Sequence, residues 1–332
     1  MKKKILILGS NSFSGNHLTR YLLKKNFFVI GCSLSQISEP KFNCIYELPK
    51  SKFKNFKFIK ININKEFSKL KKIIIKYKPK IIIDFLGQGM VAESWDYPYL
   101  TFSTNIMSKI KLYTFLMDKK FLKKYIKIST PEVFGSAKIT NSNYKIYNPS
   151  TPYALSHSTI EKYLSLLHKE FSFPVIISRF ANFYGPYQKL YRVIPLAIHK
   201  ANKKEKFFLH GGGKSKRSFI YCDDFCNGIY KLVIKAKVGE SYQFSSKEYL
   251  SIRKIVEIIY KKKNLNPKSY IINVKDRRGK DKDYKIFDND TRKKLNWKNK
   301  TTIDRGINNV INWYDKFKTN FNNKDKKFKI SV

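Results

Sequence analysis

Short apolar runs alternate with longer amphipathic stretches along the first half of the chain. The apolar runs predict strands at residues 5–8, 28–31, 56–61, 81–85, 125–129 and 175–178. Periodic apolar positions between them predict helices at about 15–25, 67–77, 98–119 and 153–171. Strands that are apolar at consecutive positions are typical of a parallel sheet covered on both faces. The order therefore predicts an α/β fold of the Rossmann type, with a doubly wound parallel sheet.

The regular alternation ends near Arg179. Beyond it, prolines and a triple glycine at 211–213 separate shorter elements, which predicts a smaller C-terminal α/β lobe. We expect a first domain over 1–179, with an interleaved boundary, and a second lobe over 180–319. The final residues, 320–332, are rich in Lys and Asn, and we expect this basic tail to fray.

A glycine-rich turn follows the first predicted strand and reads Gly-Ser-Asn-Ser-Phe-Ser-Gly from Gly9 to Gly15. Gly9 permits a sharp strand-to-helix turn, and Gly15 lets the start of the helix pack closely on the strand. The backbone amides of Ser12, Phe13 and Ser14 lie between them, where they can cradle a pyrophosphate. Because a strand precedes this turn and a helix follows it, the turn predicts a dinucleotide-binding site.

The end of the second predicted strand bears on which dinucleotide binds. An acidic residue there commonly grips the ribose of NAD. This chain instead has Gly-Cys-Ser-Leu-Ser at 31–35, with no carboxylate. Ser33 can hydrogen-bond either a ribose hydroxyl or a phosphate. The sequence therefore leaves NAD and NADP as equal alternatives.

The chain is strongly basic, with 68 Lys and Arg against 24 Asp and Glu, a net charge of +44. Clustered cations would indicate nucleic-acid binding. Here the lysines are spread from Lys2 to Lys329, and Lys, Asn, Ile and Phe, which all have A/T-rich codons, are abundant together. We therefore favour compositional drift over polyanion binding as the origin of the charge. A basic surface would still attract an anionic substrate.

Cysteine usage and apolar segments indicate a cytoplasmic protein. The four cysteines form no CxxC pair and no Cys/His metal pattern, so we predict reduced thiols and no metal site. The N-terminal apolar run is shorter than a signal peptide requires. No stretch approaches the ~20 apolar residues of a membrane helix.

Two polar motifs carry the candidate chemistry. Residues 129–135 read Ser-Thr-Pro-Glu-Val-Phe-Gly at the end of the fifth strand, and residues 152–157 read Pro-Tyr-Ala-Leu-Ser-His at the start of a helix. The second half adds Arg-Phe-Ala-Asn-Phe-Tyr-Gly-Pro at 179–186 and Arg-Ser-Phe-Ile-Tyr at 217–221. With the glycine turn, these motifs resemble the extended short-chain dehydrogenase/reductase family over nearly the whole chain. The resemblance is closest to nucleotide-sugar 4,6-dehydratases of the dTDP-glucose and GDP-mannose types.

This resemblance implies a catalytic cycle. Tyr153 would take the proton of the sugar C4 hydroxyl while hydride moves to the nicotinamide, and Thr130 would hydrogen-bond the same oxygen. Glu132 would remove the C5 proton as water leaves C6, and return of the hydride would give a 4-keto-6-deoxy sugar. Two residues depart from the family pattern. His157 replaces the family lysine, so we expect slower oxidation, and Pro131 replaces the aspartate that protonates the leaving hydroxyl.

The resemblance also implies the remaining contacts and partners. Further cofactor contacts would come from Tyr153 and His157 and from residues after the third and fourth strands: Asn62, Ile63, Leu86 and Gly87. The substrate, a nucleotide-diphosphate sugar, would be held by residues in three segments of the chain: Ser94, Asn182, Arg217 and Arg277. The family expectation is a homodimer in which helices 98–119 and 153–171 form a four-helix bundle, with no membrane partner.

The predicted function is therefore that of a nucleotide-sugar 4,6-dehydratase, a lyase with a tightly bound nicotinamide dinucleotide. Because Pro131 has no proton to give, a nucleotide-sugar epimerase or a C4 oxidoreductase is the alternative within the family. A non-catalytic RNA-binding member of the superfamily is the alternative from a different class. The retained Tyr153, Thr130 and Glu132 argue against it, since an RNA-binding scaffold has no use for them.

Overall fold

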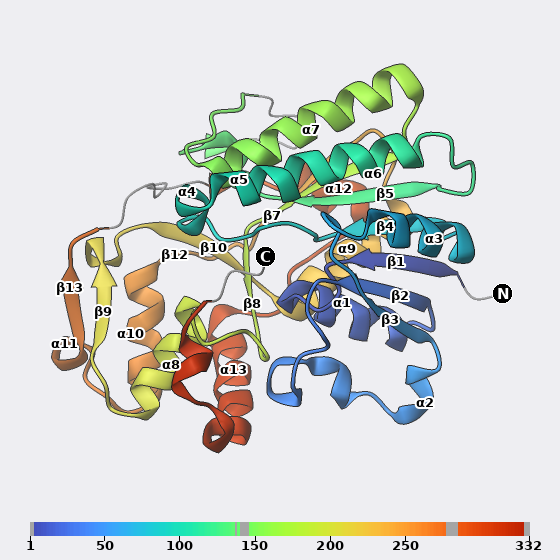
Figure 1. The fold of residues 1–332 in the computed structure, drawn as a ribbon. Helices are drawn as coiled ribbons and strands as arrows, with labels where there is room; N and C mark the ends of the chain where they lie inside the picture. The colour runs from blue at the N-terminus through green and yellow to red at the C-terminus, as the bar shows by residue number, and fades with distance from the viewer. Residues whose placement is uncertain (1–2, 137, 140–145, 277–284, 329–332) are drawn as a thin grey trace.

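A computed structural model describes residues 3–136, 138–139, 146–276 and 285–328 of the chain (Figure 1). Among these residues, seven parallel strands form one sheet in the order β11-β7-β5-β4-β1-β2-β3. The strands are β1 (Lys4–Leu8), β2 (Phe28–Ser33), β3 (Phe56–Lys60), β4 (Ile81–Asp84), β5 (Lys124–Ser129), β7 (Val175–Phe180) and β11 (Ser241–Phe244). The predicted doubly wound parallel sheet is confirmed.

Helices cover both faces of this sheet (Figure 1). One face carries α1 (Phe13–Lys24), α9 (Cys222–Lys235) and α12 (Asn289–Leu295), and the other carries α3 (Phe67–Tyr77), α5 (Pro98–Phe102), α6 (Ser108–Leu116) and α7 (Pro152–Phe171). Successive residues along a strand pack against opposite faces of the sheet. Ile5 and Ile7 pack in the core with α1 and α9, whereas Leu6 and Leu8 pack with α3 and α6. This alternation explains why the strands are apolar at consecutive positions.

The smaller C-terminal lobe has its own core around α8, α10 and α13. Its elements are β8 (Asn182–Tyr184), α8 (Val193–Asn202), β9 (Phe207–His210), β10 (Lys216–Tyr221), β12 (Tyr249–Ser251), α10 (Ile252–Lys262), α11 (Pro267–Tyr270), β13 (Ile271–Val274) and α13 (Ile303–Phe317). Short elements complete the described chain: α2 (Lys50–Phe53), α4 (Glu93–Asp96), β6 (Lys138–Ile139) and β14 (Lys285–Ile286).

The chain crosses between the two lobes more often than a division at residue 179 suggests. β11 pairs in parallel with β7, so residues 241–244 complete the first sheet. α9 and α12 also return from the C-terminal half to cover that sheet. The domain over 1–179 is therefore completed by segments from beyond residue 180.

The tail expected to fray packs instead, as far as the structure describes it. The Phe321 ring stacks on Tyr314 with centroids 5.1 Å apart. Asp325 forms an ion pair with the buried Lys41 at 3.1 Å. The aromatic ring gives this polar segment an apolar surface to bury, which composition alone did not indicate.

Two other expectations concern the cysteines and membrane segments. All four cysteines are buried and free, and Cys222 and Cys226 lie one turn apart on α9. None of the described helices combines the length and the apolar character that a membrane span requires.

Candidate active site

The glycine turn lies at the carboxyl edge of the sheet, where the strand order reverses between β1 and β4. Gly9 has a φ of +82°, and its amide donates to the Cys32 carbonyl at 2.7 Å. Ser12 caps α1 by accepting from the Gly15 amide at 3.0 Å. A Cβ at Gly15 would lie 2.1 Å from the Gly9 carbonyl oxygen, so only glycine lets α1 begin this close to β1. In open parallel sheets, ligands bind at such a reversal.

The start of α1 fits the pyrophosphate of a dinucleotide. The backbone amides of Phe13 and Ser14 lie in the first turn of this 12-residue helix, where N–H groups lack helical partners and attract anions. The Phe13 ring itself stacks on Phe183, with centroids 5.9 Å apart, so Phe13 would contribute its amide and not its side chain. The Ser33 hydroxyl accepts from the Asn11 amide at 2.9 Å and thereby closes the turn.

The cofactor residues implied by the resemblance also lie beyond the carboxyl ends of strands. Asn62 and Ile63 follow β3, with the Ile63 side chain buried. Leu86 and Gly87 follow β4. A Cβ at Gly87 would lie 2.8 Å from Oδ1 of Asn105, so the glycine makes room for that side chain.

Asn105 is a site residue that the sequence analysis missed. It lies in a π-helical turn, Ser103–Met107, between α5 and α6. Its Oδ1 accepts from the Gln88 amide at 2.8 Å, and its Nδ2 donates to the Ser156 hydroxyl at 2.9 Å. Asn105 therefore ties the loop after β4 to the start of α7. Single π turns are frequent at functional sites, but their residue spacing gives no signal in a sequence.

Thr130, Glu132 and Tyr153 converge at the end of β5. Thr130 caps a 3₁₀ turn, Pro131–Phe134, by accepting from the Glu132 amide at 3.2 Å. The Thr130 hydroxyl also hydrogen-bonds the phenol of Tyr153, the second residue of α7. The structure thus brings Tyr153 next to Thr130 and Glu132, which lie more than 20 positions earlier in the sequence.

The surroundings of the Tyr153 phenol shift its pKa in opposite directions. Burial raises the pKa of Tyr153 above its ordinary value, and the Glu132 carboxylate raises it further. The Thr130 hydrogen bond and the Arg192 guanidinium lower it. Arg192 precedes α8 in the C-terminal lobe, and the sequence analysis did not single it out. The phenol is therefore protonated at neutral pH and faces both a carboxylate and a cation.

His157 lies one turn of α7 after Tyr153. The two rings have centroids 4.7 Å apart, and His157 Nδ1 lies 3.4 Å from the Ser129 hydroxyl. Burial, followed by the charges of Lys127 and Lys109, holds the pKa of His157 well below its ordinary value. The imidazole is therefore neutral at physiological pH.

A search of family profiles identifies the chain. The profile of GDP-mannose 4,6 dehydratase matches residues 6–310. The chain belongs to this family. The match covers the glycine turn, the motifs at 129–135 and 152–157 and most of the C-terminal lobe, so the resemblance derived from the motifs is confirmed.

Named relatives agree with this assignment. The trifunctional UDP-glucose 4,6-dehydratase/UDP-4-keto-6-deoxy-D-glucose 3,5-epimerase/UDP-4-keto-L-rhamnose-reductase of Arabidopsis thaliana is 27% identical over 320 residues, 94% of this chain and 47% of that protein. The dTDP-D-glucose 4,6-dehydratase of Dictyostelium discoideum is 31% identical over 272 residues, 74% of this chain and 58% of that protein. This chain therefore spans about half the length of these two relatives.

A solved structure has the same fold over nearly the full length of both chains. The dTDP-glucose 4,6-dehydratase of Bacillus anthracis, crystallised in complex with NAD, superposes with a TM-score of 0.83 at 25% identity. The superposition covers 95% of this chain and 97% of that one. The two-lobed architecture is thus that of a dehydratase-family enzyme.

In the C-terminal lobe, two of the expected substrate residues lie on neighbouring strands. Asn182 begins β8, which pairs in parallel with β10 through Phe219. Arg217 lies on β10 two residues before that partner, and its guanidinium donates to the Lys216 carbonyl at 2.8 Å. Arg277, the third expected residue of this lobe, lies outside the described part of the chain.

Ser94, the remaining expected substrate residue, lies next to the start of α7. Its hydroxyl is buried, donates to the Val91 carbonyl at 2.6 Å and accepts from the Tyr153 amide at 3.2 Å. These contacts tie α4 to the first turn of α7. Ser94 therefore contacts the backbone of Tyr153, and its role toward a substrate stays a prediction.

A buried ion pair packs against the 3₁₀ turn that carries Glu132. The Arg179 guanidinium donates to the Glu161 carboxylate of α7 from Nε at 3.0 Å. It also lies over the Phe134 ring, 4.7 Å from the centroid. Because Phe134 ends the 3₁₀ turn that carries Glu132, these contacts connect α7, β7 and the turn.

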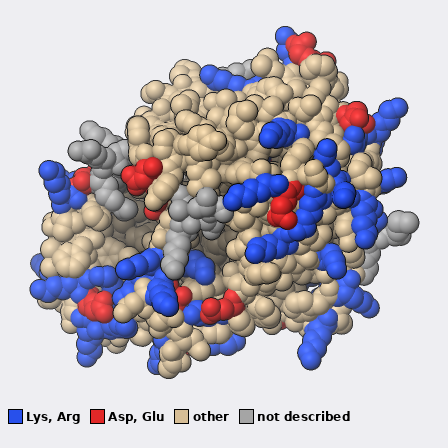
Figure 2. Space-filling view, in the orientation of Figure 1, with Lys and Arg blue, Asp and Glu red and all other residues tan. Residues whose placement is uncertain are grey.

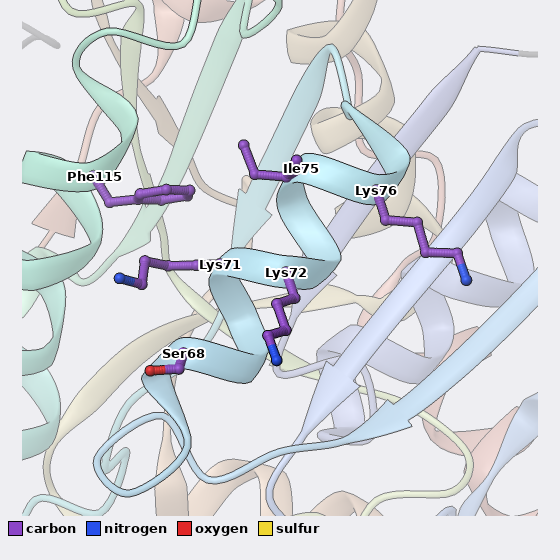
Figure 3. Close-up of a pocket in the computed structure, with 6 residues that line it drawn as sticks. All are labelled: Ser68, Lys71, Lys72, Ile75, Lys76 and Phe115. Atoms are coloured by element: carbon purple, nitrogen blue, oxygen red, sulfur yellow. The ribbon is translucent and has the colours of Figure 1, made fainter.

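Figure 3 shows an open groove that is separate from this site. It lies between α3 and Phe115 of α6, and six residues line it: Ser68, Lys71, Lys72, Ile75, Lys76 and Phe115. None of them belongs to the candidate active site. Figure 2 shows basic side chains spread widely over one face of the molecule, which agrees with the dispersed lysines of the sequence.

Proposed function

We propose that this chain is a nucleotide-sugar 4,6-dehydratase that oxidises the sugar C4 and then eliminates water across C5 and C6. The observation that carries the proposal is the hydrogen bond between Thr130 and the Tyr153 phenol, with Glu132 facing the same phenol. This group follows β5 at the carboxyl edge of the sheet, and the glycine turn follows β1, two strands along the same edge. An acid–base group for the C4 hydroxyl and a carboxylate for the C5 proton are two parts that oxidation followed by elimination requires.

The residues would act in sequence on one sugar. The phenolate form of Tyr153 would take the proton of the C4 hydroxyl, and Thr130 would orient the same oxygen by hydrogen bonding. When bound, the nicotinamide would supply the chemistry of accepting and returning the hydride. Glu132 would then remove the C5 proton, which the C4 ketone makes acidic. Arg192, whose charge reaches the phenol, would stabilise negative charge that develops there.

The loop after β2 bears on whether NAD or NADP binds. Residues 33–38 read Ser-Leu-Ser-Gln-Ile-Ser and contain no Lys or Arg that could bind a 2′-phosphate. The similar enzyme from Bacillus anthracis was solved with NAD. We therefore propose NAD as the cofactor. It would stay bound through the cycle, because the hydride that leaves the sugar returns to it.

Pro131 supports one alternative within the same site. It occupies the first position of the 3₁₀ turn, next to Glu132, and has no proton to donate to a leaving hydroxyl. An enzyme that makes the C4 ketone but cannot eliminate water would return the hydride to C4. It would then act as an epimerase or a C4 oxidoreductase.

One incubation separates these functions. The purified protein is denatured to identify released dinucleotide, and the folded protein is incubated with dTDP-glucose, UDP-glucose and GDP-mannose. We expect released NAD and a product lighter than its substrate by one water. A new sugar of unchanged mass would instead establish epimerisation. No retained dinucleotide, together with RNA binding that falls steeply with salt, would replace the proposal with nucleic-acid binding.

We also propose a homodimer formed through α5 and α7. Large apolar side chains are exposed along α5, the π turn and α7: Tyr99, Met107, Leu155, Leu166 and Phe171. Figure 2 shows few charged side chains over α5 and α7. On a chain this basic, an uncharged apolar face favours contact with a second copy.

The dimer has a direct test. The double variant Leu155→Glu/Leu166→Glu places charges three helical turns apart on the exposed face of α7, and we expect it to be monomeric by light scattering. Ile234→Glu, at an exposed position of α9, adds a charge elsewhere and should leave the dimer intact. If the unaltered protein has the 39.2 kDa mass of a single chain, this interface does not form.

A further inference from the structure

Beneath His157 lies a buried cluster of charges that the steps proposed above do not use. Asp84 at the end of β4, Lys109 on α6 and Lys127 on β5 have side chains no more than 4% exposed. The Lys109 ammonium lies 2.5 Å and the Lys127 ammonium 3.7 Å from the Asp84 carboxylate. Tyr125 donates to the same carboxylate at 2.7 Å. Two cations therefore share one anion in the interior of the sheet.

Burying three charged side chains together costs free energy of folding. Taking an ion out of water costs several kcal/mol, and a partner of opposite charge offsets that cost. Asp84 and Lys109 alone would form a balanced pair, so Lys127 adds one positive charge without an added carboxylate. The surplus charge needs an explanation beyond stability.

His157 is the titratable group that this surplus charge faces. Lys127 and Ser129 lie on the same face of β5, and Ser129 Oγ is 3.4 Å from His157 Nδ1. The charges acting on the imidazole come from three elements: Lys127 of β5, Lys109 of α6 and Asp84 of β4. From its own helix, the Tyr153 ring packs against it. The net charge of this surrounding set is +1 when both lysines are protonated.

Resting on the proposed function, we infer that Lys109 and Lys127 are positioning residues that hold His157 as a neutral imidazole. An imidazolium donates from both nitrogens, whereas a neutral imidazole has one acceptor and one donor. The Ser129 hydroxyl can pair with Nδ1 of the neutral ring, either as donor or as acceptor. The cluster thus acts, together with burial, on the charge of the residue next to Tyr153. Burial lowers the pKa of Lys109 to about 8, so the cluster keeps its full charge at and below neutral pH.

The test is an NMR pH titration of His157, which does not depend on turnover. The chain has five histidines, and His157→Gln assigns the signal. We expect the unaltered His157 to titrate well below its ordinary pKa, because burial and the two lysines both disfavour the imidazolium. In Lys127→Met, which leaves the balanced Asp84–Lys109 pair, the pKa of His157 should rise toward its ordinary value of about 6.5. Lys111→Met, at an exposed position of α6 two residues beyond Lys109, removes the same formal charge and should leave the titration of His157 unchanged.

Moving a cation from position 127 to position 157 gives a second test, in which the melting temperature is measured. His157→Lys would place a third cation near one carboxylate, so it should lower the melting temperature. Combined with Lys127→Met, the same substitution should be tolerated, because the number of cations is restored. If His157 titrates at its ordinary pKa in the unaltered protein, or if Lys127→Met leaves its titration unchanged, the inference is wrong. If Lys127→Met shifts the His157 titration but the unaltered protein turns over no nucleotide sugar, the proposed function is wrong and the inference about His157 stands.

Discussion

Tyr153→Phe is expected to abolish C4 oxidation while leaving the fold and the retained dinucleotide intact. The substitution removes only the phenolic oxygen, so the ring contact with His157 at 4.7 Å remains. Loss of a positioned acid–base group costs about 10²–10⁴ in rate. The measurement is single-turnover appearance of reduced cofactor absorbance after mixing with the nucleotide sugar that the unaltered protein consumes.

A matched control and a pH profile make this result specific. Tyr163→Phe removes a hydroxyl from the same helix, α7, ten residues on, and should oxidise the sugar at the unaltered rate. Burial and Glu132 raise the pKa of Tyr153, so the phenolate fraction grows as pH rises through the neutral range. The oxidation rate of the unaltered protein should therefore rise with pH. Full activity of Tyr153→Phe would show that another group takes the proton.

The sheet was largely predictable because its inner strands are buried on both faces. Such strands need consecutive apolar residues, and all five inner strands appear as apolar runs in the sequence, as does the edge strand β3. β11 was not predicted because its sequence, Ser-Tyr-Gln-Phe, has no such run. Its place at the edge of the sheet comes from pairing with β7, some 60 residues earlier, and that register leaves no local pattern.

The candidate site was predictable where its chemistry lies in contiguous motifs. Thr130, Glu132 and Tyr153 belong to motifs whose residue types and order carry the resemblance, and the fold brings them together. The supporting residues were not predictable. Asp84 and Lys127 are register partners on β4 and β5, and they meet Lys109 only because α6 covers that face. Charged residues within apolar elements are read from sequence as surface positions, so only the fold reveals this buried cluster.

Pro131→Asp is the second change with a large expected effect. We expect it to accelerate loss of water from the C4-oxidised sugar by about 10²–10⁴-fold, since it supplies the general acid that this position lacks. Pro131 is buried at the first position of the 3₁₀ turn, beside Glu132. Burial and a neighbouring carboxylate both raise the pKa of an aspartate, so the new group would carry its proton at neutral pH. Mass spectrometry of the product over time measures the loss of water directly.

The turn itself should tolerate this substitution. Aspartate is favourable at the start of a helical turn, and Thr130 would keep its cap on the Glu132 amide. Replacing the proline costs about 1 kcal/mol, mainly through the greater freedom of the unfolded chain. Pro131→Asn has nearly the same shape but no acidic proton, so it should leave elimination at the unaltered rate. If both variants eliminate water no faster than the unaltered protein, position 131 does not face the C6 hydroxyl. The acid would then have to come from another residue or from water, and the elimination step would need a different geometry from the one proposed.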